Sequence, residues 1–402
     1  MNRISVILAA AALLLAVPSM SQEYGELFES ETASGMRAES PVLSSGDEEA
    51  VADYVRGCFR SSGLDVLDSP DDSNFGILSA QGDTLRCHNA IGFIQGYDRK
   101  LKDSYIVVGA PIRGNVSGLL ALLSLARTLS ANRVLLKRSV ILAAFGAADV
   151  ENAGSWYFIN RSFASDASRV DAMIDLCLLG QESRGFYAYT ASNADMNQFV
   201  LNLAGTLQPV HPKIITAEPA ISDHRSFYAK EIPFIQFTTG PVPHLGTVSE
   251  RLEYEGIERA VEYIYHYAVE LACGATPAFT PMEVEKPERE ADTVAWADCD
   301  WKPTFMNNAD PSVFLQRWVY TYLKYPQYAV DNGIQGKVLV DFVIDEKGKV
   351  RDVKVLKGVH SSLDEEAVKV VEASPDWKPA RVRGKKVKCE MSLYIEFRLK
   401  KR

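Results

Sequence analysis

The segment GAPIRGNVSG, Gly109–Gly118, follows the apolar run Tyr105–Val108 and leads into a Leu- and Ala-rich stretch that predicts a helix over Ser117–Leu129. An apolar strand, a short turn and a helix in this order indicate an α/β domain, in which ligands bind at the carboxyl ends of the strands. The turn contains no His, Asp, Glu or Cys. It therefore has the place of an active-site loop without such a side chain to bind a metal or move a proton.

The alternation of short apolar strands and helices continues on both sides of this turn. Val51, Tyr54, Val55 and Phe59 recur at helical spacing and predict a helix over Asp47–Arg60. Further strands are expected at Ala90–Ile94, Ser139–Phe145, Ala172–Leu179 and Phe234–Phe237, and further helices at Asn193–Leu207 and Glu255–Leu271. This pattern predicts an α/β domain whose sheet is largely buried and flanked by helices.

The composition changes at the end of this domain. Proline residues and the acidic run EVEKPEREAD predict a linker over residues 274–300. Beyond it, the alternating runs VLVDFVI and MSLYIEFRL predict half-buried antiparallel strands, with a hairpin turn at Gly348. The segment Ser362–Glu365 has the spacing of a capping box and opens a helix. Residues 301–402 are therefore expected to form a small α+β domain.

The charge distribution also divides the chain. The net charge of −9 opposes nucleic-acid binding. Residues 311–402 carry 19 Lys and Arg against 12 Asp and Glu, a net charge of +7, so the rest of the chain carries −16. Segments of opposite charge indicate two domains with different surfaces, although the solubility of each domain explains the charges equally well.

The first 21 residues have the pattern of a secretory signal peptide, with one basic residue, an apolar stretch and small residues before a cleavage site after Ser21. An uncleaved membrane anchor is the alternative, and Pro18 interrupts the apolar stretch early. Residues 22–45 are polar and predict a flexible leader. No other segment is long and apolar enough to span a bilayer.

The six cysteines leave the disulfide pattern open. Export permits disulfides, but the spacing contains no CxxC and cannot choose among the possible connectivities. Buried free thiols explain the cysteines equally well. The six residues are Cys58, Cys87, Cys177, Cys273, Cys299 and Cys389.

Five stretches of the first domain follow one another in a recognisable order. They are CHNAIGFIQGYDRKLKDSYIVVGA, NVSGLLALLSLARTL, FGAADVENAGSWYF, SDHRSFYAKEIPFIQFTTG and the segment around His244. In this order they resemble the secreted di-zinc aminopeptidases of metallopeptidase family 28, over residues 46–273. The resemblance implies two zinc ions bridged by a carboxylate, His and carboxylate ligands at strand ends, and a Glu that acts as general base.

The residues that the resemblance places at the active site differ from that pattern. The family's first zinc-binding His corresponds to Pro111, and its bridging Asp corresponds to Gly114. The general-base Glu corresponds to Ala148. None of these three side chains coordinates zinc or takes up a proton, so we expect no catalytic residue and no bound metal.

Three further ligand positions leave an alternative open. The family's Glu, Asp and His ligands correspond to Asp149, Cys177 and His244. These three residues are the candidates for a rebuilt single-zinc site, which would make the protein a divergent zinc aminopeptidase. The other interpretation is a strand-end Asp, a buried thiol and a surface His. Zinc is expected only under the enzyme alternative.

The second domain carries a separate set of motifs. KPTF, LKYP, the hairpin GIQGKVLVDFVIDEKGKV, LDEEAVKVV, DWKPA and the final strand follow one another from Trp301 onward. Together they resemble the TonB C-terminal domain. The resemblance implies that this domain binds partners by accepting an extended peptide as an added strand, with Tyr325, Pro326 and Trp377 as partner-binding residues. A structural appendage is the alternative.

Taken together, these patterns predict an exported, periplasmic protein of the cell envelope. Its first domain is expected to be a pseudoenzyme that binds peptides or proteins, and its second domain is expected to dock to envelope partners. A TonB-type accessory protein for outer-membrane transport, with outer-membrane receptors as partners, is the further alternative. We expect no nucleic-acid partner and no membrane span after signal cleavage.

Overall fold

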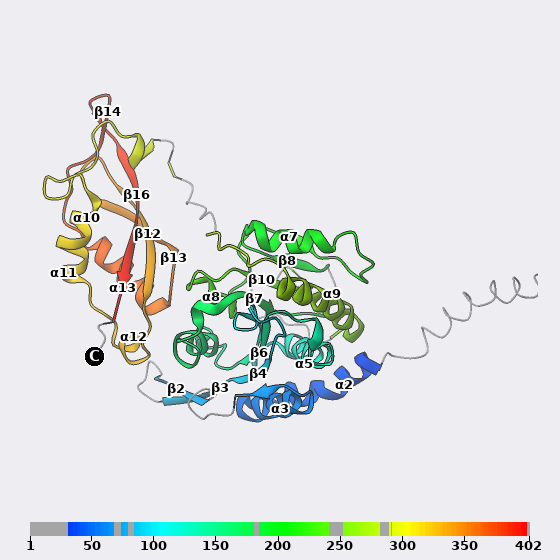
Figure 1. Cartoon of the computed structure of the whole chain (residues 1–402). Helices are drawn as coiled ribbons and strands as arrows, with labels where there is room; N and C mark the ends of the chain where they lie inside the picture. Colours follow the sequence, from blue (N-terminus) through cyan, green and yellow to red (C-terminus); the bar gives the residue numbers. More distant parts are fainter. Residues whose placement is uncertain are drawn as a thin grey trace, which may run out of the picture. The chain divides into compact units, whose positions relative to one another are not determined.

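The computed structural model describes residues 31–67, 74–78, 84–180, 185–240, 252–281, 289–290 and 292–399. The chain divides into two compact units (Figure 1). The first unit comprises Met1–Phe75 and Cys87–Pro281, and the second comprises Gly76–Arg86 and Met282–Arg402. The predicted signal peptide lies outside the described residues. None of the helices formed by the described residues has the length and apolar character needed to cross a membrane.

The first unit is built on a mixed sheet to which the described residues contribute eight strands, in the order β1-β4-β6-β5-β7-β10-β8-β9. The central strands β6, β5, β7 and β10 are parallel, while β4 and β8 run antiparallel to their neighbours β6 and β10. This arrangement confirms the predicted α/β class. The strands are β1 (Asp65–Val66), β4 (Ala90–Ile94), β5 (Tyr105–Pro111), β6 (Ser139–Phe145), β7 (Val170–Leu176), β8 (Tyr187–Tyr189), β9 (Lys213–Ile215) and β10 (Phe234–Thr238).

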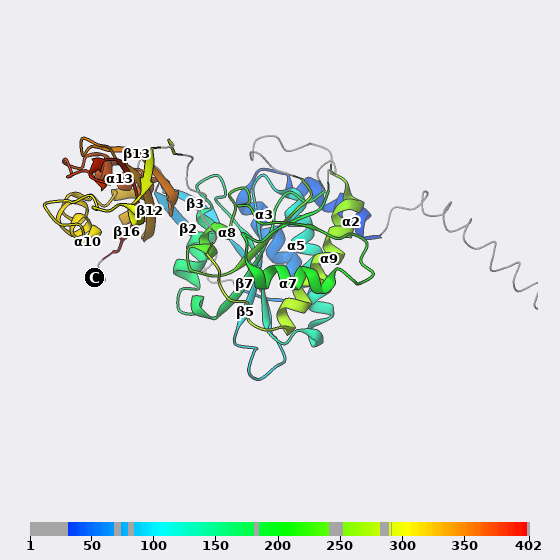
Figure 2. The same cartoon turned by 90° about the horizontal axis from the view of Figure 1, so that it is seen from above.

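Helices cover both faces of this sheet because its central strands are buried along almost their whole length. Helices α3 (Glu48–Ser61), α5 (Val116–Ala131) and α9 (Tyr254–Cys273) pack on one face, where Figure 2 shows α5 and α9 next to each other. Helix α8 (His224–Tyr228) packs on β7 and β10 and contacts α6 (Ala153–Tyr157). Beyond β8 the chain forms α7 (Ala194–Leu203), which packs on α9.

The N-terminal segment departs from the sequence expectation. Instead of a flexible leader throughout residues 22–45, the chain forms helix α2 over Glu31–Leu43, packed on α5 and α9. Ala33, Met36 and Leu43 of this helix are buried in the core. These three side chains cover apolar surface of α5 and α9, so burial rather than local helical propensity explains the helix.

A buried arginine fixes the end of helix α9. Arg138 has 1% of its surface exposed and pairs with Asp171 at 2.6 Å. Its guanidinium also donates to the carbonyl of Gly274, at 2.7 Å, and to the hydroxyl of Thr276, at 2.8 Å. A buried charge is stable only when it is paired and fully hydrogen-bonded, and Arg138 meets this condition with the chain that follows α9.

The second unit contains a sheet of four strands among the described residues, in the order β11-β16-β12-β13. Three strands, β12 (Gly336–Ile344), β13 (Val350–Lys357) and β16 (Lys388–Phe397), are antiparallel as predicted. The fourth strand, β11 (Thr293–Ala295), pairs with β16 in parallel. It belongs to the segment expected to be linker, so this short strand was not predicted from the sequence.

Helices and an aromatic core complete the second unit. Phe305, Phe314, Phe342 and Trp377 pack together, with ring centroids 4.9–6.5 Å apart. The helices are α10 (Pro311–Phe314), α11 (Tyr320–Tyr322), α12 (Gln327–Asp331) and α13 (Ser361–Glu372), and β14 (Arg381–Val382) pairs with β15 (Lys385–Lys386). Strands β2 (Asn74–Leu78) and β3 (Thr84–His88) form a separate hairpin.

Candidate functional site

The carboxyl ends of β5, β6 and β7 meet at one edge of the first unit's sheet. Pro111 ends β5 opposite Phe145, which ends β6, and β7 ends at Leu176 beside β5. The turns after these parallel strands hold the predicted positions Gly114 and Cys177, together with Ala148 and Asp149. Topology therefore brings these positions to the same edge of the sheet, as the sequence predicts.

The turn between β5 and α5 is fixed by an asparagine. The Asn115 amide donates to the carbonyl of Leu176 at 2.7 Å. Its oxygen accepts the backbone N–H groups of Gly118, at 3.2 Å, and Leu178, at 2.8 Å. Asn115 thus caps helix α5 and ties the turn to the end of β7. The preceding Gly114 has φ +70°, a conformation that favours glycine.

An arginine of this turn lies between two carboxylates. Arg113 Nε is 3.3 Å from Glu48 Oε2, and its Nη1 is 3.3 Å from Asp149 Oδ2. Glu48 is buried, with 7% of its surface exposed, and accepts the backbone N–H groups of His88 and Ala147, each at 2.9 Å. The guanidinium therefore supplies positive charge where carboxylates from two separate segments converge.

Ala148, the residue predicted to occupy the general-base position, cannot act as a base. Ala148 carries only a methyl group and is half-buried in the turn after β6. Ala147, Glu151 and Asn152 of the same turn have φ values of +51° to +55°. Their left-handed backbone is strained for residues other than glycine, and the Glu48 carboxylate, by accepting the Ala147 N–H, holds part of it in place.

Cys177, at the end of β7, is a buried thiol. It has 1% of its surface exposed. Burial raises the pKa of Cys177 well above its usual range, and the charges of Asp175 and Asp223 raise it further. A thiol binds zinc as the thiolate. The environment of Cys177 favours the neutral form instead.

Behind this edge lies a buried polar network. Asp175 accepts hydrogen bonds from Gln236 Nε2, at 3.0 Å, and from the hydroxyl of Ser222, at 3.2 Å, and its Oδ2 is 2.8 Å from His224 Nδ1. The adjacent Asp223 is fully buried, and neither of its oxygens has a partner of ordinary hydrogen-bond geometry. Burial, followed by the charge of Asp175, raises the pKa of Asp223 well above its usual range.

The described residues at this edge are not arranged to hold a zinc ion. Over the part of the chain that the structure describes, no group of three or more His, Cys, Asp or Glu side chains is arranged to hold a metal. Of the three residues considered for a single-zinc site, Asp149 pairs with Arg113 and Cys177 is a buried thiol. His244 lies outside the described residues. A guanidinium beside the exposed carboxylate also opposes the approach of a second cation.

Sequence patterns did not reveal the charges that fill this edge. Arg113 stands inside the turn GAPIRGNVSG, so its position was visible, but its partner Glu48 is far away in sequence.

A pocket of about 520 Å³ lies away from the strand ends. It is lined by residues 61–63 and by residues between Arg127 and Arg133, at the C-terminal end of α5. Because α5 has 16 residues, its two ends are about 24 Å apart, so the pocket is not the cleft expected at the strand ends.

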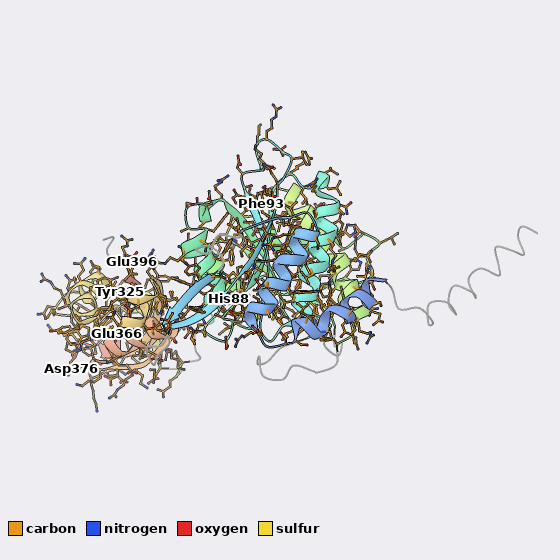
Figure 3. All side chains as sticks on the ribbon, turned by 90° about the horizontal axis from the view of Figure 1, so that it is seen from below. His88, Phe93, Tyr325, Glu366, Asp376 and Glu396 are labelled. Carbon is orange, nitrogen blue, oxygen red and sulfur yellow. The ribbon has the colours of Figure 1, made fainter. Side chains whose placement is uncertain are left out.

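In the second unit the predicted partner-binding residues have different surroundings. Tyr325, labelled in Figure 3, is half-buried. Its hydroxyl donates to the carbonyl of Ile334 at 2.6 Å, and its ring packs edge-on against Phe397. Pro326 precedes helix α12 as its N-cap. Trp377, by contrast, is 4% exposed and belongs to the aromatic core. Its side chain is covered in this structure, and a role of Trp377 in partner binding stays a prediction.

The outer edge of β16 is only partly paired. β11 covers Lys388–Glu390, while the stretch Met391–Phe397 has no strand partner on this side among the described residues. The backbone N–H of Glu396 points to this side, where it reaches the hydroxyl of Tyr320 at 3.2 Å. Since directions alternate along a strand, the N–H of Tyr394 points the same way. Tyr394 itself is 51% exposed.

Two protein families match the chain. The profile of Peptidase family M28 matches residues 103–269, and the profile described as Gram-negative bacterial TonB protein C-terminal matches residues 321–399. A comparison with curated protein sequences finds no match. The two families predicted from sequence motifs are thus confirmed, each for its own part of the chain.

Solved structures similar to the chain are aminopeptidases and a cyclase. The aminopeptidase from Aneurinibacillus sp. strain AM-1 is 23% identical, with 52% of this chain and 53% of that chain covered and a TM-score of 0.40. The Legionella pneumophila LapA aminopeptidase is 18% identical, with 61% of this chain and 70% of that chain covered and a TM-score of 0.45. The Porphyromonas gingivalis glutaminyl cyclase is 17% identical, with 60% of this chain and 96% of that chain covered and a TM-score of 0.46. The chain spans about half the length of the Aneurinibacillus enzyme.

Proposed function

From a chain that joins a peptidase family M28 domain to a TonB C-terminal domain, we propose an exported envelope protein whose first domain binds peptides or proteins without zinc chemistry. Its second domain docks to envelope partners by accepting an added strand. The proposed location is the periplasm. The name of the TonB family supports an envelope setting, and the signal-peptide pattern of residues 1–21 supports export.

The observation that carries this proposal is the position of Arg113. In a metallopeptidase the carboxylates at the strand ends hold metal ions, and a nearby Glu activates the bound water. Here Arg113 pairs with the carboxylates of Glu48 and Asp149, and Ala148 stands at the base position. The guanidinium of Arg113, instead of a metal ion, compensates the negative charge of these carboxylates, so the fold is stable without a metal.

The second domain supports docking through its sheet edge. The stretch Met391–Phe397 of β16 offers backbone groups on its outer side, as strand addition requires. Tyr320 and the half-exposed Tyr394 lie beside this edge and provide apolar surface for alternate side chains of a peptide. The net charge of +7 over residues 311–402 favours acidic or neutral peptides over basic ones.

Metal content tests the first half of the proposal. The mature chain, residues 22–402, is incubated with zinc, dialysed and analysed by elemental mass spectrometry. We expect no stoichiometric zinc, and no change in metal content for Cys177→Ala or His244→Ala. One or two tightly bound zinc ions per chain, lost in these variants, would support the single-zinc alternative and overturn the pseudoenzyme.

Peptide binding tests the second half. Fluorescently labelled extended peptides, including sequences of the type found at the periplasmic end of outer-membrane receptors, are titrated with the chain. Tyr394→Pro removes an outward N–H of β16 without removing a bond to β12, whereas the control Tyr394→Ala keeps the N–H. We expect the proline variant to lose binding at least tenfold relative to the alanine variant. Equal affinities would exclude strand addition at this edge.

The class of peptide that binds also decides the transport alternative. High affinity for receptor-derived peptides would favour a TonB-type accessory role in outer-membrane transport. Binding of unrelated extended peptides with equal affinity would favour a general docking role in the envelope.

A further inference from the structure

The segment just before the TonB-like sheet is fastened to that sheet by ion pairs. Arg289 contacts the buried carboxylate of Asp341, and its other nitrogens lie 3.5 Å from Glu390 and 3.8 Å from Asp352. Lys388, on β16, contacts Glu290 and lies 3.2 Å from Asp292. Ion pairs between this segment and the sheet thus hold residues 289–290 and 292–295 in place. We call this stretch the strap.

The strap ends in strand β11, which occupies part of the edge of β16. Thr293, Val294 and Ala295 pair with Lys388, Cys389 and Glu390 in parallel register. Three residue pairs make a short strand, and short strands at a sheet edge open readily when nothing else holds them. The strap therefore has a weak hydrogen-bonded part whose attachment depends on additional contacts.

Such a contact lies directly beyond β11. A 3-10 turn, Trp296–Asp298, brings Cys299 back against β16, where its Sγ lies 3.7 Å from Cys389 Sγ. Both cysteines are buried, with exposures of 5% for Cys299 and 0% for Cys389. Cys389 is the residue of β16 that pairs with Val294. The two sulfur atoms are in contact without a bond between them.

We propose that Cys299 and Cys389 form a disulfide in the oxidised protein, and that this disulfide locks the strap onto the edge of β16. The sulfur atoms need to approach from 3.7 Å to about 2.05 Å, a change that small side-chain rotations supply. The two cysteines are 90 residues apart in the chain, so the bond closes a long loop and restricts the unfolded chain strongly.

The chemistry is thiol–disulfide exchange with a disulfide-containing oxidant, either a protein disulfide or a small one such as glutathione disulfide. One cysteine thiolate attacks the oxidant, forms a mixed disulfide and releases one oxidant sulfur as a thiol. The second cysteine thiolate attacks the mixed disulfide and releases the other sulfur as a thiol. The two cysteines are oxidised, the oxidant is reduced, and the two thiol protons pass to the released sulfurs.

Burial determines when this exchange takes place. It raises the pKa of Cys389, so the folded protein holds this residue as a poorly nucleophilic thiol. The bond therefore forms while the strap is still open, during folding in an oxidising compartment. Once closed, it is shielded from reductants by the same burial.

The consequence for binding rests on the proposed function. A locked strap keeps Lys388–Glu390 occupied, so an incoming peptide is limited to the remaining edge, Met391–Phe397. A reduced strap can open and release the whole length of β16. Oxidation state would then set how much of the edge a partner can use.

Peptide mapping tests the disulfide itself. The full chain is unfolded, refolded in the presence of glutathione disulfide, alkylated in denaturant without reduction, digested and analysed by mass spectrometry. We expect a cross-linked peptide that joins Cys299 to Cys389, which Cys299→Ser abolishes and the control Cys58→Ser leaves intact. Alkylation of both cysteines in the oxidised chain, or pairing of either one with another cysteine, would overturn the proposal.

Hydrogen exchange tests the lock and does not depend on any partner. We expect the amides of Thr293–Ala295 to exchange at least tenfold faster after reduction and in Cys299→Ser than in the oxidised parent. The conservative variant Cys299→Ala gives the same comparison should serine disturb the buried site. Equal exchange rates in oxidised and reduced protein would show that the ion pairs hold the strap alone, which would overturn the lock. Peptide titrations of the two redox forms then test the binding consequence separately.

Discussion

Arg113 lies 3.3 Å from the carboxylate of Asp149 and reaches back, through its Nε, to the buried carboxylate of Glu48. One side chain therefore neutralises two acidic groups that come from segments about a hundred residues apart. At the strand ends of a metallopeptidase, metal ions perform this neutralisation. The pairing explains how the sheet edge remains stable with Pro111, Gly114 and Ala148 in its turns.

Replacing Arg113 tests this neutralising role. Arg113→Gln leaves Glu48 with its two backbone hydrogen bonds but without a cation, so we expect a loss of about 1 kcal/mol of unfolding free energy, limited by the partial exposure of Arg113. Chemical denaturation measures it, with Arg99→Gln at an exposed site as the control. A loss of unfolding free energy no larger than that of the control would contradict the neutralising role of Arg113.

Asp223 and Asp175 are expected to respond in opposite directions to amidation. Asp223 is buried without a well-placed hydrogen-bond partner, so Asp223→Asn removes an ionisable group and should stabilise the fold by about 1–2 kcal/mol at neutral pH. Asp175→Asn weakens the hydrogen bond that Gln236 donates to Asp175 and the pairing of Asp175 with His224. This substitution should lower the free energy of unfolding by about 2–3 kcal/mol. Denaturation of both variants at pH 7 measures the contrast, and equal signs would contradict it.

The effect of Asp223 also depends on pH. The pKa of Asp223 is raised in the folded state. Above the pKa of Asp in the unfolded chain, about 3.9, the folded protein therefore holds a proton that the unfolded chain releases. Stability contributed by this group is therefore complete below that pH and falls as the pH rises towards the folded pKa. The advantage of Asp223→Asn over the parent should grow from pH 4 upward. A pH-independent advantage would show that ionisation of Asp223 is not the cause.

Two tyrosines of helix α9 form a matched pair. Both are fully buried. The Tyr267 hydroxyl donates to the carbonyl of Met196 at 3.2 Å, whereas the Tyr263 hydroxyl has no hydrogen-bond partner among the residues that the structure describes. Tyr263→Phe should therefore stabilise the protein by about 1 kcal/mol, and Tyr267→Phe should destabilise it by about 1 kcal/mol. Thermal unfolding of the two variants side by side provides the measurement. The prediction fails if the two substitutions shift the melting temperature in the same direction.

The turn quoted at the start depends on Asn115. Asn115→Ala removes three hydrogen bonds at a buried site and leaves the carbonyl of Leu176 without its side-chain donor, so we expect a loss of about 2–4 kcal/mol. Asn132→Ala, at the other end of α5, removes one side-chain bond to Thr128 and should cost about 1 kcal/mol or less. Urea denaturation compares the two. Similar losses would mean that the turn is held by its backbone alone.

Much of the first unit's fold could be predicted because its strands are short, apolar and bounded by turn residues. Strand β6 has the bounds expected from its sequence, Ser139–Phe145, since every residue in it is buried. Helix α2 was missed because its buried residues, Ala33, Met36 and Leu43, are few and separated by polar ones. Their burial depends on surfaces of α5 and α9 that form only when the chain has folded.

The site was predicted less completely than the fold. The strand-end positions were located because each follows an apolar strand. The partners that fill the edge were not, since Glu48 meets Arg113 and Ala147 through long-range contacts that no local pattern encodes. Strand β11 escaped for a related reason, because its three residues lie in an acidic, proline-rich stretch and gain strand structure only from pairing with β16.

The backbone of Gly114 limits what this turn can hold. With φ +70°, the position suits glycine, and an L-residue introduced there would carry backbone strain of about 1 kcal/mol or more. A metal-binding side chain engineered at this position would therefore act against the conformation of the turn. The glycine that lets the chain pass from β5 to Asn115 thus sets an energetic cost on any attempt to install a ligand there by a single substitution.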